Sequence, residues 1–208
     1  YIERDRVAPS GKSVTDKIVK STTGVEYIIG RKSDVNGIRN IYRARRLFDG
    51  KECVFKEYIP SPESRRIHNA IKRNIQIFMK YPLTEDDGKT PLLSFIGPLD
   101  KDSLIDLPQS NGFGYIMEPI DMEVFFSVSN LWHQDVYPSI SIIFKACHNI
   151  AHLFRRVHLK GWCYKDINER NIYINYQTGD IRIIDCDNIG IQSAKALKGS
   201  DGYMAPEM

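Results

Sequence analysis

The pattern of hydrophobic and polar positions changes character along the chain. Across residues 25–58, short β-type apolar runs alternate with turn signals, and Asn36-Gly37 and Asp49-Gly50 separate the runs. An Asp-Gly pair between two such runs favours a β-hairpin. We therefore expect three strands joined by tight turns in this region. Residues 1–23 show no clear period and indicate a tail or a loosely attached first strand.

Two stretches have the spacing of amphipathic helices. Apolar residues recur at helical intervals over residues 67–79 until Pro82, and Ser61 followed by Pro62 is typical of a helix start. A longer helix is expected over residues 139–159. Its apolar stripe consists of Ile143, Ala146, Ile150, Leu153 and Val157.

The remaining apolar runs predict strands. Residues 83–113 are rich in Asp, Gly, Pro and Ser around the run at 92–96, which indicates loops flanking one strand. Residues 115–120 predict a buried strand that ends at Pro119. Runs at 172–174 and 181–184, joined by a four-residue turn, predict a rigid hairpin. A β-rich first half with one helix, followed by a helix-led second half, predicts an α+β fold with two lobes.

Composition narrows the class of protein. The 208 residues are 42% hydrophobic, which is enough for one sizeable core or two small lobes. With 29 basic and 26 acidic residues, the net charge of +3 gives no reason to expect nucleic acid or a membrane as the main partner. The four cysteines lie far apart without C-x-x-C spacing, and no apolar run has the length of a membrane span. We therefore expect a cytoplasmic protein.

Three oxygen-bearing side chains have the chemistry needed for phosphoryl transfer. Asp166 and Asn171 lie in the sequence YKDINERN, and Asp185 follows in IIDCD. Transfer of a phosphoryl group from a nucleotide needs one carboxylate to orient the attacking hydroxyl, and further oxygen ligands to hold magnesium. We predict Asp166 as the catalytic base, with Asn171 and Asp185 as ligands of Mg²⁺.

These motifs resemble those of the protein kinase family. The segment GWCYKDINERN resembles a kinase catalytic loop, and Asp185-Cys186-Asp187 stands where the family has Asp-Phe-Gly. The segment GSDGYMAPE resembles the end of the activation segment. The Asp-Cys-Asp motif, together with Asn168 in place of the usual catalytic-loop Lys, is most similar to divergent eukaryotic-like kinases of bacteria. The resemblance implies a tail at 1–23, a first lobe at 24–118 and a second lobe at 119–208 that is cut off after Ala-Pro-Glu.

The resemblance also implies a set of ATP-binding residues. Lys56, in VFK, corresponds to the Lys that grips the nucleotide phosphates, and Gly37 to a reduced phosphate-covering loop. In GYIMEPI, Met117 corresponds to the gatekeeper residue. The backbone of Glu118 and Ile120 would bind the adenine base.

Departures from the family pattern leave two functions open. Asn74 stands where the family has a Glu that pairs with the phosphate-binding Lys, and only Gly30 and Gly37 occur in the phosphate-covering region. One reading is a serine/threonine protein kinase that uses ATP and Mg²⁺, with the Ala-Pro-Glu ending favouring a protein substrate. The alternative is a pseudokinase that acts as a nucleotide-binding or scaffolding module. The resemblance implies that further helices of the second lobe follow Ala-Pro-Glu. Without them the apolar stripe of the helix at 139–159 would be partly uncovered, so we also expect self-association.

Overall fold

The computed structural model describes residues 17–36, 39–61, 64–85, 92, 94–100, 102–132, 137–185, 187 and 189–191. The chain divides into two compact units. Unit 1 comprises Tyr1–Ser64 and Leu99–Pro119, and unit 2 comprises Arg65–Pro98 and Ile120–Met208. Residues 65–98, which the sequence prediction assigned to the first lobe, thus group with unit 2. The predicted lobe boundaries themselves stay predictions.

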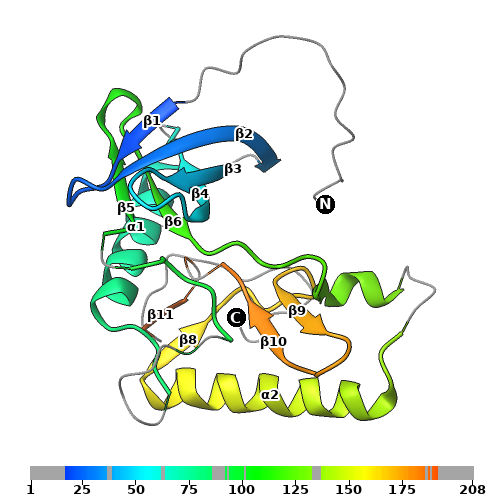
Figure 1. Cartoon of the computed structure of the whole chain (residues 1–208). Coiled ribbons are helices and arrows are strands. Elements are labelled where there is room, and N and C mark those ends of the chain that lie inside the picture. The colour runs from blue at the N-terminus through cyan, green and yellow to red at the C-terminus, as the bar shows by residue number, and fades with distance from the viewer. Residues whose placement is uncertain are drawn as a thin grey trace, which may run out of the picture. The chain divides into compact units, whose positions relative to one another are not determined.

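The described part of unit 1 forms one antiparallel sheet (Figure 1). Its strands are β1 (Lys17–Lys20), β2 (Glu26–Asn36), β3 (Arg39–Arg46), β4 (Glu52–Tyr58), β5 (Leu104–Leu107) and β6 (Gly112–Met117), and the 3-10 turn η1 is Pro108–Ser110. The strand order is β1-β2-β3-β4-β6-β5. The three strands predicted over residues 25–58 are confirmed as β2, β3 and β4. Gly50 has φ 72° in the turn before β4, a conformation that favours glycine. Part of the predicted tail is ordered, because β1 pairs with β2.

The strand predicted at residues 92–96 is wrong. Among the described residues of that run, Phe95 makes one isolated bridge to Ile183 and no ladder follows. The strand that joins the sheet is β5, which pairs with β6 and buries Leu104 and Ile105. The sequence of β5, LIDL, is too short to show a period. Its pairing depends on a neighbour that only the folded sheet supplies.

One hydrophobic cluster of unit 1 lies on a single face of the sheet. It consists of Val19, Tyr27, Ile29, Ala44, Cys53, Phe55, Ile105 and Ile116. Successive residues of a strand point to opposite faces. Phe55 therefore enters this core, whereas Lys56, the next residue of β4, faces the other way.

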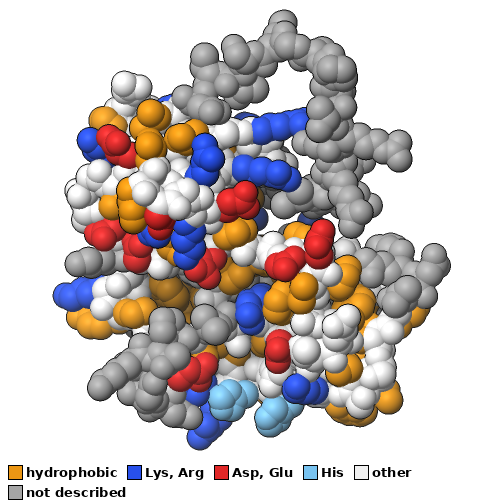
Figure 2. Space-filling view, in the orientation of Figure 1, with side chains coloured by type: hydrophobic (Ala, Val, Ile, Leu, Met, Phe, Trp, Pro, Cys, Tyr) orange, Lys and Arg blue, Asp and Glu red, His pale blue; other side chains and the backbone are white. Residues whose placement is uncertain are grey.

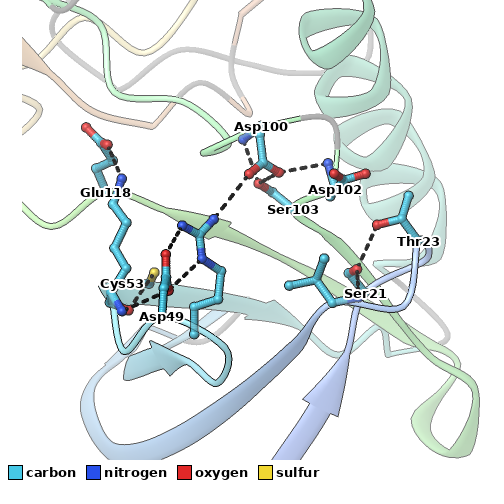
Figure 3. A network of polar contacts seen from close by, with 11 residues as sticks. Ser21, Thr23, Asp49, Cys53, Asp100, Asp102, Ser103 and Glu118 are labelled. Atoms are coloured by element: carbon cyan, nitrogen blue, oxygen red, sulfur yellow. Dashed lines mark hydrogen bonds and ion pairs between the residues drawn. The ribbon is translucent and has the colours of Figure 1, made fainter.

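A polar network ties the turn between β3 and β4 to two other segments of unit 1 (Figure 3). The Arg46 guanidinium donates through Nε to Asp49 Oδ1 over 3.0 Å, and its Nη1 atom lies 3.7 Å from Asp100 Oδ2. The hydrogen bond from Arg46 lowers the pKa of Asp49 to about 2. Lys51 Nζ donates to Glu118 Oε1 over 2.9 Å at the end of β6. These pairs are partly exposed, so they contribute orientation more than stability.

In its described residues, unit 2 combines two helices with two small sheets. Its elements are α1 (Arg65–Lys80), β7 (Phe125–Ser127), the 3-10 turn η2 (Val128–Trp132), α2 (Ile140–Leu159), β8 (Trp162–Tyr164), β9 (Ile172–Asn175), β10 (Ile181–Ile183) and β11 (Ile189–Ile191). One sheet has the order β10-β9-β7 and the other pairs β11 with β8. The helix α2 contacts β8 and β10 and runs beneath the small sheets in Figure 1.

Both predicted helices and the predicted hairpin are confirmed. The Ser139 hydroxyl accepts a hydrogen bond from the backbone N–H of Ile142 and caps α2. Within the predicted stripe, Ala146, Leu153 and Val157 are buried. The hairpin pairs β9 with β10, and Gly179 adopts φ 74° in its turn.

The described surface is mixed in charge. On the face that Figure 2 shows, acidic and basic side chains lie interspersed, in line with the small net charge of +3. Within the described part of the chain, no helix has both the length and the hydrophobicity needed to cross a membrane.

Candidate active site

The loop after β8 holds Asp166 between two side-chain amides. Asn171 Nδ2 donates to the backbone carbonyl oxygen of Asp166 and to its Oδ2 atom, over 3.0 Å in each case. Asn168 Nδ2 donates to Asp166 Oδ1 over 3.1 Å and to the carbonyl oxygen over 3.3 Å. Each oxygen of the carboxylate thus accepts a hydrogen bond from a different amide. The structure brings two of the predicted site residues, Asp166 and Asn171, into direct contact.

Local turn chemistry explains why this loop folds as it does. Asn168 Oδ1 accepts a hydrogen bond from the backbone N–H of Arg170 over 3.0 Å, and the Asn168 carbonyl accepts one from Asn171 N–H over 3.2 Å. Asn side chains commonly stabilise turns in this way. The Glu169 carbonyl accepts from the Ser127 hydroxyl over 3.0 Å, which fastens the loop to β7.

Asp185 directly follows Ile184, which is hydrogen-bonded to the loop that holds Asp166. The backbone N–H of Ile184 donates to the Asn171 carbonyl over 3.0 Å, and the Tyr164 hydroxyl donates to the Ile184 carbonyl over 2.7 Å. Asp185 is buried and has φ 68°. A positive φ is uncommon for a residue other than glycine, and such conformations concentrate at functional sites. Asp185 thus lies directly after Ile184, whose backbone N–H is bonded to Asn171.

Three carboxylates lie within electrostatic reach of Tyr164. Burial raises the pKa of this phenol well above its usual range, and the charges of Asp185, Asp166 and Asp187 raise it further. Tyr164 therefore stays a neutral hydrogen-bond donor.

Asn171 and Asp185 carry oxygen atoms of the kind that magnesium accepts as ligands. Because Asn171 Nδ2 donates to Asp166, its Oδ1 atom is the one that can act as a metal ligand. Magnesium keeps several waters and binds through one or two carboxylates, so one amide oxygen and the Asp185 carboxylate are suitable protein ligands. No group of three or more His, Cys, Asp or Glu side chains suited to a metal occurs among the described residues, and the predicted pair does not require one.

Asp187 and Asn74 are connected within unit 2. The Asn74 Nδ2 atom, on α1, donates to the backbone carbonyl of Asp187 over 3.3 Å, and Asp187 is buried. The sequence predicted Asn74 in the place of a kinase Glu. Its side-chain amide thus contacts the segment that follows Asp185. Cys186 lies outside the described residues.

Lys56 lies in unit 1 against two aromatic rings. It is 1% exposed, and its Nζ atom lies 5.7 Å from the ring centre of Tyr58 and 5.9 Å from that of Tyr115. Tyr58 is two positions along β4, and Tyr115 is the register partner of Lys56 on β6, so all three side chains share one face. Cation–π attraction stabilises a desolvated ammonium group in such a setting. Sequence reasoning missed both tyrosines, although the alternation in VFKEY is a signal for Tyr58.

The neighbouring Glu57 is a polar residue that sequence reasoning also missed. It is buried, and its Oε2 atom accepts hydrogen bonds from Asn40 Nδ2 and from the Tyr42 hydroxyl, each over 2.9 Å. Burial and this hydrogen bond to Glu57 raise the pKa of Tyr42 to about 12. The carboxylate is thus satisfied within the sheet, on the face opposite Lys56.

The remaining predicted nucleotide-binding residues are distributed over both units. Met117 is the buried last residue of β6, and Glu118 follows it and pairs with Lys51. Ile120 is half-buried at the start of the second segment of unit 2. Gly37 lies outside the described residues.

Comparison with known proteins identifies the fold. No protein family model matches the sequence, and no curated protein matches it. Among solved structures, the chain is similar to the autoinhibited serine kinase domain of the giant muscle protein titin, with a TM-score of 0.58 and 11% sequence identity. The chain has a protein-kinase-like fold. The match covers 79% of this chain and 46% of the titin structure, so the chain spans less than half the length of that relative.

The predicted α+β, kinase-like fold is therefore confirmed at the level of the fold. At 11% identity the likeness shows the fold alone. The resemblance to divergent bacterial kinases stays a prediction, and so do the roles of the site residues.

Proposed function

We propose that the protein is a serine/threonine protein kinase that transfers a phosphoryl group from ATP, with Mg²⁺, to a protein substrate. The observation that carries this proposal is the contact between Asn171 and Asp166, with Asp185 directly after the residue bonded to Asn171. A kinase-like fold with these residue types in this order supports the reaction class.

In the proposed reaction Asp166 acts on the attacking hydroxyl. Its carboxylate accepts a hydrogen bond from the acceptor hydroxyl and takes the proton as the new oxygen–phosphorus bond forms. The bond between the γ-phosphorus of ATP and its bridging oxygen breaks in the same transfer, and ADP is the leaving group. The amides of Asn168 and Asn171 hold this carboxylate in one orientation. Positioning of this kind lowers the barrier because the reacting groups need no further ordering.

The nucleotide and the metal would be held by the other predicted residues. Asn171 Oδ1 and the Asp185 carboxylate would bind Mg²⁺, which when bound neutralises the charge of the phosphates. Lys56 would bind the α- and β-phosphates, and the backbone near Gly37 would cover them. Met117 would contact the adenine base, whose edge would bond the backbone of Glu118 and Ile120.

The substrate and the compartment belong to the same proposal. The Ala-Pro-Glu motif, which resembles the end of the activation segment of protein kinases, supports a protein rather than a small molecule as acceptor. The cysteine pattern supports a cytoplasmic location.

A pseudokinase is the second candidate. Asn74 is neutral, and its side-chain amide donates to the Asp187 carbonyl. An amide cannot neutralise the ammonium charge of Lys56, so that group would be held more loosely on the phosphates than in a kinase with a Glu at this position. This observation favours a protein that binds nucleotide and turns over slowly or not at all.

Two measurements separate the candidates. A thermal-shift titration of the full chain with ATP, with and without Mg²⁺, reports binding. Transfer of labelled phosphate to casein and myelin basic protein reports catalysis, for the wild type and for Asp166→Ala. Asp180→Ala, an exposed carboxylate in the turn between β9 and β10, is the matched control.

The kinase is supported if the wild type and Asp180→Ala transfer phosphate and Asp166→Ala does not. Stabilisation by Mg²⁺ and ATP without transfer supports the pseudokinase. If ATP causes neither stabilisation nor phosphate transfer, the kinase and the nucleotide-binding form of the pseudokinase are both contradicted, and only a scaffolding module remains.

A further inference from the structure

Asn168 makes two separate kinds of contact in the loop that holds Asp166. Its Oδ1 atom accepts a hydrogen bond from the backbone N–H of Arg170 over 3.0 Å, which closes a turn of the loop. Its Nδ2 group donates to the Asp166 Oδ1 atom over 3.1 Å and to the Asp166 carbonyl over 3.3 Å. The acceptor atom thus bonds the backbone alone, whereas the donor group bonds both the carboxylate and the backbone carbonyl of Asp166.

The donor contact has a consequence for the Asp166 side chain. The terminal torsion of an aspartate is broad, so neighbouring groups must fix the orientation of its carboxylate. Asn168 holds one oxygen and Asn171 Nδ2 holds the other, over 3.0 Å. Rotation of the carboxylate would break both hydrogen bonds at once. Hydrogen bonds to an ionised group are stronger than those between neutral groups, so this restraint is substantial.

We propose that Asn168 is a positioning residue, which fixes the Asp166 carboxylate through Nδ2 independently of its role in shaping the loop through Oδ1. This inference rests on the proposed phosphoryl transfer, because it assigns Asn168 an effect on that reaction. Asn168 does not itself touch the nucleotide or the acceptor hydroxyl in this assignment. It acts through Asp166.

Substitutions can remove one contact and keep the other. Asn168→Asp and Asn168→Ser keep an oxygen acceptor for Arg170 N–H and lose the Nδ2 donor; the ionised Asp has no donor at all, and the shorter Ser carries only a hydroxyl donor one atom nearer the backbone. The Ser variant adds no charge, so agreement between the two excludes electrostatic repulsion as the cause. Asn168→Lys keeps a donor for Asp166 and loses the acceptor. Asn149→Asp removes another amide donor of unit 2, which donates to the Gly179 carbonyl over 2.9 Å, and serves as the control.

The proposal predicts that catalysis follows the donor and stability follows the acceptor. We expect Asn168→Asp and Asn168→Ser to lower kcat by about tenfold to hundredfold, the range for a hydrogen bond to a charged group, with KM for ATP changed by less than about twofold. Asn168→Lys is expected to keep most of kcat and to unfold at a lower temperature. Asn149→Asp is expected to lower only the unfolding temperature. Equal losses of kcat in Asn168→Lys and Asn168→Ser would overturn the proposal.

A second readout does not depend on activity. In the ligand-free full chain, the side-chain amide resonance of Asn168 should shift in Asp166→Ala, while that of Asn149 stays in place. An unchanged Asn168 resonance means that the hydrogen bond is absent, and it overturns the proposal even if the wild type transfers phosphate. If the wild type transfers no phosphate, the proposed function fails. In that case a shifted Asn168 resonance would show that the hydrogen bond exists but has no effect on catalysis, which also overturns the positioning role.

Discussion

The side-chain amide of Asn171 donates to both the backbone carbonyl and the Oδ2 atom of Asp166, over 3.0 Å in each case. This contact joins the proposed catalytic base to a proposed magnesium ligand. The same geometry decides which atom of Asn171 is left to bind a metal. The two proposed roles are therefore coupled, and a change at either residue should affect both.

Replacing Asn171 by Asp tests this coupling. The substitution removes the donor and sets a second carboxylate against Asp166. We expect phosphoryl transfer to fall by about a hundredfold or more, and the free energy of unfolding to fall by about 1–3 kcal/mol, because hydrogen bonds to a charged group are lost. Labelled-phosphate transfer and urea unfolding measure the two effects. Asn149→Asp is the control, and a variant with unchanged transfer would contradict the coupling.

Replacing Tyr164 by Phe should destabilise unit 2. The hydroxyl donates to the Ile184 carbonyl over 2.7 Å, just before Asp185, whereas the ring contacts with Phe95 and Phe154 remain after the substitution. Loss of one buried hydrogen bond costs about 1 kcal/mol. Thermal unfolding measures the loss. Tyr137→Phe, at a tyrosine that is 61% exposed, should have no effect. Equal stability of wild type and Tyr164→Phe would show that the bond contributes nothing.

Stability should fall at alkaline pH because buried tyrosines resist ionisation. Burial raises the pKa of Tyr27 and of Tyr42 to about 12, and it raises the pKa of Tyr164 as well. In the unfolded chain these phenols ionise near their ordinary value of about 10. Between about pH 10 and 12 the folded state therefore keeps protons that the unfolded state has released, and stability falls as the pH rises.

Urea midpoints measured from pH 8 to 12 would test this dependence. We expect a constant midpoint below about pH 9.5 and a decline above about pH 10. Tyr42→Phe should weaken the decline, because one of the shifted groups is gone. A midpoint that stays level up to pH 12 would contradict the assignment.

Replacing Gly114 by Ala should disrupt the sheet of unit 1. A Cβ atom there would overlap the Phe55 ring and lie 2.7 Å from the Lys56 carbonyl oxygen. Overpacking of this kind costs about 1–3 kcal/mol. Gly30→Ala is the matched control on β2, since its Cβ would lie 3.5 Å from the Arg43 carbonyl, an ordinary contact. Urea unfolding of both variants measures the difference, which should vanish if the sheet can relax around Gly114.

Self-association should depend on the exposed face of α2. Ile140 and Phe144 are 68% and 70% exposed at its first turns, and apolar surface of this kind promotes association. We expect sedimentation velocity to show a concentration-dependent dimer of the full chain. Replacing both residues by Ser should reduce it. Phe48→Ser, at a residue of unit 1 that is 73% exposed, is the control. A sharp monomer for the wild type at all concentrations would refute this expectation.

Local signals in the sequence were sufficient for most secondary structure. The alternation and turn residues of β2 to β4, the helical spacing of α1 and α2, and the hairpin of β9 and β10 depend on neighbours within a few positions. The strand β5 was missed because LIDL has no period and pairs only with β6. The run at 92–96 was misread because an apolar run is buried here without forming a ladder.

The sequence by itself determined the chemical types of the candidate site and their order, because the carboxylates and amides of Asp166, Asn171 and Asp185 lie in recognisable local motifs. Only the tertiary structure decided which groups surround them. It brought Asn168 to the Asp166 carboxylate, Asn74 to the Asp187 carbonyl, and Tyr115 to Lys56. The Asn74 and Tyr115 contacts join segments far apart in the sequence, and the Asn168 contact depends on a side-chain direction that the folded loop fixes. The spacing of residues along the sequence predicts neither the long-range contacts nor the side-chain direction.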